Sequence, residues 1–240
     1  MSTRGPTTAP SPAGPRRSRV PAAACLAAIA LLTLLGGAGL WLASRPPAWW
    51  SALPSERPDA PDRAAALENG ALTALHTFRA PDETWTVELK QDDANAWIAH
   101  RLARWLENRA LAGPETRTAL SAARLSFESD RVRAALPAAG RVITLSVRLA
   151  VSDDGALYAR DVRLAVGSLP VPAWALKRLS GLDEARADPA LIEILAGRTP
   201  LVRPAELVLE DGRTIRLLEI RAHHGTLRLT CATRLPSSTR

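Results

Sequence analysis

Apolar and polar positions divide this chain into two parts. From Val20 to Ala43 no charged residue interrupts the apolar run, which is long enough for an α-helix to cross a hydrocarbon core of roughly 30 Å. From Arg63 onward, apolar residues recur instead with helical or strand spacing. The pattern predicts a transmembrane helix over 20–43 and a folded domain over 63–236.

The segments around the apolar run predict its orientation. Before the run the only charged residues are Arg4, Arg16, Arg17 and Arg19, and all 24 acidic residues follow it. Because cytoplasmic flanks carry the excess of cations, we expect residues 1–19 to lie in the cytoplasm and the main domain to lie outside it. Residues 1–19 lack apolar periodicity, so we expect them to be a disordered tail. Residues 44–62 are expected to form a proline-rich linker, and 237–240 a short tail. A cleaved signal peptide is the alternative, although its apolar region usually runs only 7–15 residues.

Two stretches of the main domain have helical spacing. Leu67, Ala71, Leu75 and Phe78 fall on one stripe and predict a helix over 63–78. A second helix is expected to begin with Asp92 or Asp93 as its N-cap and to end before residue 113. Its apolar face would carry Ala94, Trp97, Ile98, Leu102, Trp105 and Leu106. Further helical segments are expected at 172–181 and 186–196.

The remaining pattern is that of strands joined by short turns. Apolar and polar residues alternate in several segments, at 85–89, 124–129, 132–136, 141–152, 156–166, 206–209, 214–222 and 226–234. Residues 153–155 and 210–213 are turn signals of hairpin length, and 167–172 are expected to break the sheet. The predicted fold class is α+β: an N-terminal transmembrane helix, then one curved antiparallel β-sheet of about seven to eight strands packed against amphipathic helices.

Composition and motifs give no sign of catalytic chemistry. The chain has two cysteines, which excludes a disulfide-built domain, and no basic block interleaved with aromatics, which argues against nucleic acid as a partner. Phosphate-binding glycine loops, GxSxG, HExxH and CxxC are absent from the sequence. Asp92–Asp93 and Asp153–Asp154 are better explained by a helix cap and a turn than by acid–base catalysis. We therefore expect no enzyme, no catalytic residue, no metal and no cofactor.

Two segments together resemble a known family. The first, VELKQDDANAWIAHRL (87–102), contributes Asp92, Asn95 and Trp97, and the second, VGSLPVPAWAL (166–176), contributes the matched positions Gly167, Leu169, Pro170 and Pro172. Over residues 85–180 the chain is similar to the YpmS-like group of bacterial, single-pass, membrane-anchored proteins of unknown function. It also resembles, more distantly, envelope proteins of the AsmA group, which are tied to lipid transport. The resemblance implies a domain facing outward from a bacterial cytoplasmic membrane, and it brings no catalytic residues.

The leading functional hypothesis is a non-enzymatic domain that binds a lipid or another apolar ligand during envelope maintenance. Its ligand-binding candidates are the apolar residues of the second helix and of the central strands, Trp97, Ile98, Leu102, Trp105, Ile143, Leu145, Val147, Leu164, Val166 and, at the mouth, Leu169. The expected partners are the membrane, through Val20–Ala43, and a lipid. The alternative is a scaffold that binds an envelope protein through an exposed sheet edge or through the predicted membrane anchor. An apolar groove open to solvent favours the first hypothesis, and a filled core with an exposed patch favours the second.

Overall fold

The computed structural model describes residues 22–51, 57–108, 120–172, 193–194 and 196–235. The chain divides into two units, Met1–Leu40 and Trp41–Arg240. The first contains most of helix α1 (Ala22–Ser44), and the second contains every other described element. The helical segments predicted at 172–181 and 186–196 fall mainly on 173–192, outside the described residues.

The predicted segment is helical in α1 (Ala22–Ser44), but its assignment as a transmembrane helix is wrong. A span requires about 20 consecutive, predominantly apolar helical residues. Among the helices whose residues the structure describes, none is both long and apolar enough to cross a membrane. This finding contradicts the assignment of Val20–Ala43 as a membrane-crossing element of the fold.

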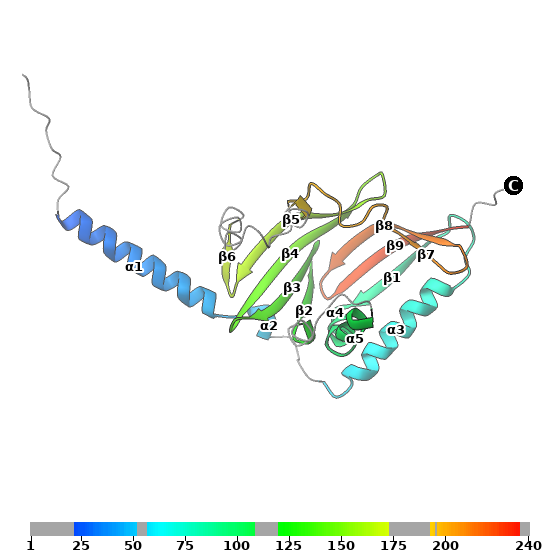
Figure 1. Ribbon diagram of the computed structural model, residues 1–240, viewed down its shortest axis with the longest axis horizontal. Coiled ribbons are helices and arrows are strands. Elements are labelled where there is room, and N and C mark those ends of the chain that lie inside the picture. The colour runs from blue at the N-terminus through cyan, green and yellow to red at the C-terminus, as the bar shows by residue number, and fades with distance from the viewer. Residues whose placement is uncertain (1–21, 52–56, 109–119, 173–192, 195, 236–240) are drawn as a thin grey trace, which may run out of the picture. The chain divides into compact units, whose positions relative to one another are not determined.

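The second unit is α+β, but its strands form two antiparallel sheets rather than one curved sheet (Figure 1). The four-stranded sheet has the order β1-β9-β8-β7, with bounds β1 (Thr84–Lys90), β7 (Glu206–Val208), β8 (Thr214–His223) and β9 (Thr226–Arg234). The five-stranded sheet is a meander in chain order, β2 (Arg124–Glu128), β3 (Arg131–Ala138), β4 (Arg141–Val151), β5 (Leu157–Val166) and β6 (Leu169–Val171).

The hairpins expected from the turn signals are present. The alternation of apolar and polar residues could not predict that β1 pairs with β9. β2 pairs with β3, β4 with β5, and β8 with β9, each across a short turn. β1 pairs with β9, its partner from the far end of the chain, in a register that sets Trp85 opposite Cys231. The segment 167–172, predicted only to break the sheet, also forms β6, which folds back on β5.

Helices pack on the four-stranded sheet, where the core lies. They are α3 (Ala60–His76), which begins within the predicted linker, and a continuous stretch made of α4 (Gln91–Trp97), the π-helical turn η1 (Ile98–Leu102) and α5 (Ala103–Asn108). A short helix, α2 (Ala48–Ser51), also lies within that linker. One core cluster joins Ala94 of α4, Phe127 of β2, Ala222 of β8 and Leu227 of β9. The other joins Trp85, Ile215 and Cys231.

Helix α4 also closes the outer edge of β2. Asn95 donates from Nδ2 to the carbonyl of Leu125 (2.9 Å) and accepts from its N–H (2.6 Å), and Gln91 Oε1 accepts from the N–H of Phe127 (2.8 Å). Side chains four apart on a helix share a face, and alternate residues of a strand share an edge, so the two spacings match. The cap prediction was wrong: α4 begins at Gln91 with Lys90 as N-cap, and Asp93 instead pairs with Arg63 of α3 (2.7 Å).

Candidate functional site

An apolar groove lies between the helices and the four-stranded sheet. Its volume is about 360 Å³. Among the described residues that line it, all except Glu68 are apolar: Leu67, Ala71, Leu72 and Leu75 of α3, Val87 and Leu89 of β1, Trp97, Trp105 and Leu229. We call this set the helix groove. Trp105 is 43% exposed and Leu72 is 49% exposed, so the groove is open to solvent. An open, apolar hollow of this size lies within the range of small-ligand sites.

The π-helical turn brings the two predicted tryptophans together in the helix groove. In a regular helix, residues eight apart differ by about 80° around the axis. The wider turn at Ile98–Leu102 absorbs about one residue, so Trp97 and Trp105 come close to one line along the helix. Their ring centroids lie 6.5 Å apart at an interplanar angle of 60°, an edge-to-face contact. The groove wall formed by these rings therefore depends on a local irregularity.

The other predicted ligand residues lie elsewhere. Ile98 is buried and Leu102 is half-buried, and neither is among the residues that line the helix groove. The candidates on strands all belong to the five-stranded sheet, where the ladders set Leu145 opposite Leu164, Ile143 opposite Val166, Val147 opposite Val132 and Val166 opposite Leu169. The structure thus brings Trp97 and Trp105 to the groove and places the strand candidates on another sheet.

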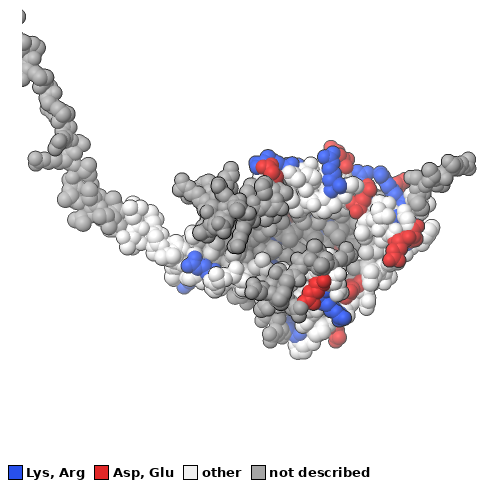
Figure 2. Space-filling view, viewed as in Figure 1, with Lys and Arg blue, Asp and Glu red and all other residues white. Residues whose placement is uncertain are grey.

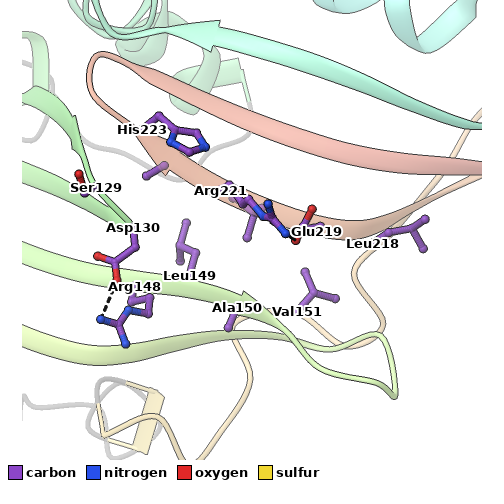
Figure 3. A pocket seen from close by; sticks show the side chains of 12 residues that line it. Ser129, Asp130, Arg148, Leu149, Ala150, Val151, Leu218, Glu219, Arg221 and His223 are labelled. Carbon is purple, nitrogen blue, oxygen red and sulfur yellow. Dashed lines mark hydrogen bonds and ion pairs between the residues drawn. The ribbon is translucent and has the colours of Figure 1, made fainter.

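A second hollow lies between the two sheets (Figure 3). This inter-sheet cleft has a volume of about 750 Å³. It is lined by residues 148–151 of β4, residues 218–223 of β8, and the β2–β3 turn at Ser129 and Asp130. The cleft is bridged at one end, where the N–H of Asp130 donates to the carbonyl of Ala222 (2.9 Å). Figure 3 shows β4 and β8 running side by side with Leu149 and Arg221 between them.

Each wall of the inter-sheet cleft is the edge of a strand, at residues beyond the point where pairing with its neighbouring strand ends. Pairing between β3 and β4 ends at Val132–Val147, and pairing between β7 and β8 ends at Glu206–Arg216. Within the described part of the chain, residues 148–151 and 218–221 therefore each have a paired strand on one side only. Each edge also follows a register shift, at Ser146/Arg148 in β4 and at Leu217/Glu219 in β8. Bulges of this kind end pairing and bend the strand.

Charged groups in the inter-sheet cleft are neutralised in pairs. Arg148 binds Asp130 at 2.7 Å, and Arg221 binds Glu219 at 2.5 Å. The apolar side chains of Leu149, Val151 and Leu218 lie among these pairs. Sequence reasoning did not identify this site, because neither a bulge nor the end of a ladder leaves a signature in the alternation of a strand.

The described residues offer little for nucleophilic or metal chemistry. Cys231 is buried, and burial raises the pKa of its thiol above the ordinary value, which disfavours the reactive thiolate. No group of three or more potential metal ligands gathers among the residues that the structure describes. His224 Nε2 lies 3.0 Å from Ser129 Oγ.

On the described surface visible in Figure 2, cationic and anionic side chains are interspersed, without a continuous patch of either sign.

The chain was also compared with known proteins. It matches no protein-family model, and it matches no curated protein with significance, so the resemblance to the YpmS-like group stays a prediction.

Proposed function

We propose that this protein binds an apolar ligand, most simply the acyl chain of a lipid, in the helix groove, without catalysing a reaction. The observation that carries the proposal is an apolar hollow, open to solvent, with Trp97 and Trp105 in its wall. Aromatic side chains offer a large and rigid apolar area, which suits an apolar chain as ligand. Action in a bacterial envelope, outside the cytoplasm, stays a prediction.

Charge in the helix groove should abolish ligand binding. In the Leu72→Asp variant a bound acyl chain would bury an unpaired carboxylate, and this burial costs free energy. We expect the full-length protein, purified in mild detergent, to carry added mass in native mass spectrometry that fragments as a lipid. We expect Leu72→Asp to reduce the fraction of protein that carries this adduct by about tenfold or more.

The matched control is Leu201→Asp. Leu201 is 41% exposed, close to the 49% of Leu72, and does not line the helix groove. The control should keep the lipid adduct and a similar melting temperature. A clean apo mass for the wild type, or equal loss of adduct in both variants, would contradict the proposal.

A second candidate function is a scaffold that pairs with a strand of a partner protein at the inter-sheet cleft. It is favoured by the one-sided pairing of residues 148–151 and 218–221, because an added strand gains main-chain hydrogen bonds along such edges. The neutralised charges and apolar side chains of the cleft suit an extended segment with apolar residues at alternate positions.

A crosslinking experiment tests this scaffold. With a photocrosslinking residue at Leu218, which is 38% exposed in the cleft, we expect one discrete adduct in cells. The same residue at Leu201, outside the cleft, should give none. Adducts of equal intensity from both positions, or none from Leu218, would count against strand pairing.

A further inference from the structure

A third hollow lies on the polar face of the five-stranded sheet. Its volume is about 340 Å³, and we call it the arginine pocket after Arg131, Arg133 and Arg163 in its lining. Trp49 of α2 and Ser168 also border it. Of the predicted ligand residues described above, Leu164 lies along it. The arginine pocket belongs to a different sheet from the helix groove, so a ligand bound in it is independent of the proposed function.

Strand register places the cations of the arginine pocket in a row. Arg133 of β3 is opposite Ser146 of β4, which in turn is opposite Arg163 of β5. Two steps between neighbouring strands separate the backbones of Arg133 and Arg163 by about 10 Å. Arg131 stands two residues before Arg133 and therefore on the same face. Long guanidinium side chains at this separation can reach one small anion between them.

The row is held in place by carboxylates that do not themselves line the pocket. Arg131 is 8% exposed and donates to the carboxylate of Asp161, to the carbonyl of Asp161 (3.1 Å) and to Ser146 Oγ (3.3 Å). Arg163 also binds Asp161 (3.0 Å), and Arg133 binds Glu128 through one nitrogen (2.5 Å). Among the described residues, these three cations thus share two carboxylates. Burial and the positive charges of Arg163 and Arg148 lower the pKa of Arg131 from its ordinary value.

A buried hydroxyl of the arginine pocket has no partner. Thr144 lines the pocket on the neighbouring row and is 6% exposed, and its Oγ1 has no hydrogen-bond partner among the residues that the structure describes. Buried polar groups are nearly always satisfied, so an orphaned hydroxyl needs an explanation. A ligand oxygen is one explanation, and it is the one that also accounts for the excess of guanidinium groups.

We propose that the arginine pocket binds a phosphate group, held by Arg133 and Arg163 from the two sides, by the hydroxyl of Ser146 between them and by the hydroxyl of Thr144 on the neighbouring row. Guanidinium forks match the oxygens of phosphate and are the usual choice for its recognition. The phosphate can belong to a lipid headgroup or to a small soluble molecule. The chemistry recognised is the same in both cases.

Two probes separate these sources. The full-length protein in detergent is titrated with inorganic phosphate and followed by phosphorus NMR. It is then reconstituted with vesicles of phosphatidylcholine, with or without phosphatidic acid, and the lipid that copurifies is measured. Arg133→Gln with Arg163→Gln should weaken phosphate binding by about 100-fold, since each charge-assisted bond contributes strongly. The charge-matched control, Arg160→Gln with Arg228→Gln, removes two cations outside the pocket and should stay within about twofold.

The Thr144→Val variant separates a loss of phosphate binding from a loss of folding. Replacing an unsatisfied buried hydroxyl with a methyl group should leave the melting temperature unchanged or raised, and it should still weaken phosphate binding by about fivefold. Binding of inorganic phosphate alone assigns a soluble ligand, whereas enrichment of phosphatidic acid alone assigns a headgroup. No binding of either probe by the wild type, or unchanged binding in both the arginine and threonine variants, overturns the proposal.

Discussion

Replacing Phe127 with alanine is expected to lower the free energy of unfolding by about 3–5 kcal/mol. Phe127 of β2 is 2% exposed and packs where helix α4, strands β8 and β9 and its own sheet meet. It shares a core cluster with Ala94, Ala222 and Leu227, small or branched residues that cannot expand to fill the space left behind. The measurement is chemical denaturation of the full-length chain, followed by circular dichroism.

The chain offers a matched control at its other phenylalanine. Phe78 is 76% exposed, and its ring lies 5.9 Å from the guanidinium of Arg213. Phe78→Ala should therefore change the free energy of unfolding by less than about 1 kcal/mol. An equal loss of unfolding free energy in the two variants would contradict the central place of Phe127 in the core.

Replacing Gly167 with alanine is expected to release the end of helix α1 from the turn between β5 and β6. Gly167 has φ +59°, and an added Cβ would lie 2.4 Å from the carbonyl oxygen of Ala43 and 2.5 Å from that of Arg45. Both are backbone atoms, so no side chain can move aside. The backbone strain alone costs about 1–2 kcal/mol, and the contacts add to it.

Hydrogen exchange of the Ser168 amide reports this release, because its N–H donates to the carbonyl of Leu42 (2.9 Å). We expect the exchange rate to rise by about 100-fold for a local loss of roughly 3 kcal/mol. The control is Gly140→Ala, which has a similar φ of +73° but no atom within 4 Å of the added Cβ. The Gly140→Ala variant has the backbone strain without the steric clash, so it should leave the exchange rate of the Ser168 amide unchanged.

Two of the residues on which the predicted resemblance rests make specific contacts in the fold. A side chain at Gly167 would collide with backbone atoms at the end of α1 and just after it, and Asn95 satisfies both backbone groups of Leu125. The sequence marked Asn95 and Gly167 as part of a pattern, but not what each contacts. Those contacts come from segments 30 or more residues apart, and helical or strand spacing describes only neighbours along the chain.

The local elements of this protein could be predicted from its sequence. Strict alternation around short turns predicted the hairpins β2–β3, β4–β5 and β8–β9, because the side-chain period of a strand is a local property. Helical spacing likewise predicted α3 and the stretch from α4 to α5, and it marked Trp97 and Trp105 as neighbours on an apolar face.

How these elements combine could be learned only from the folded chain. Pairing of β1 with β9 divides the strands into two sheets, the π-helical turn aligns the two tryptophans, and the ends of two ladders open the inter-sheet cleft. The row of Arg133, Ser146 and Arg163 exists only once three strands are in register. Long-range pairing and register depend on which contacts bury the most surface together, and that is a property of the assembled chain rather than of any segment.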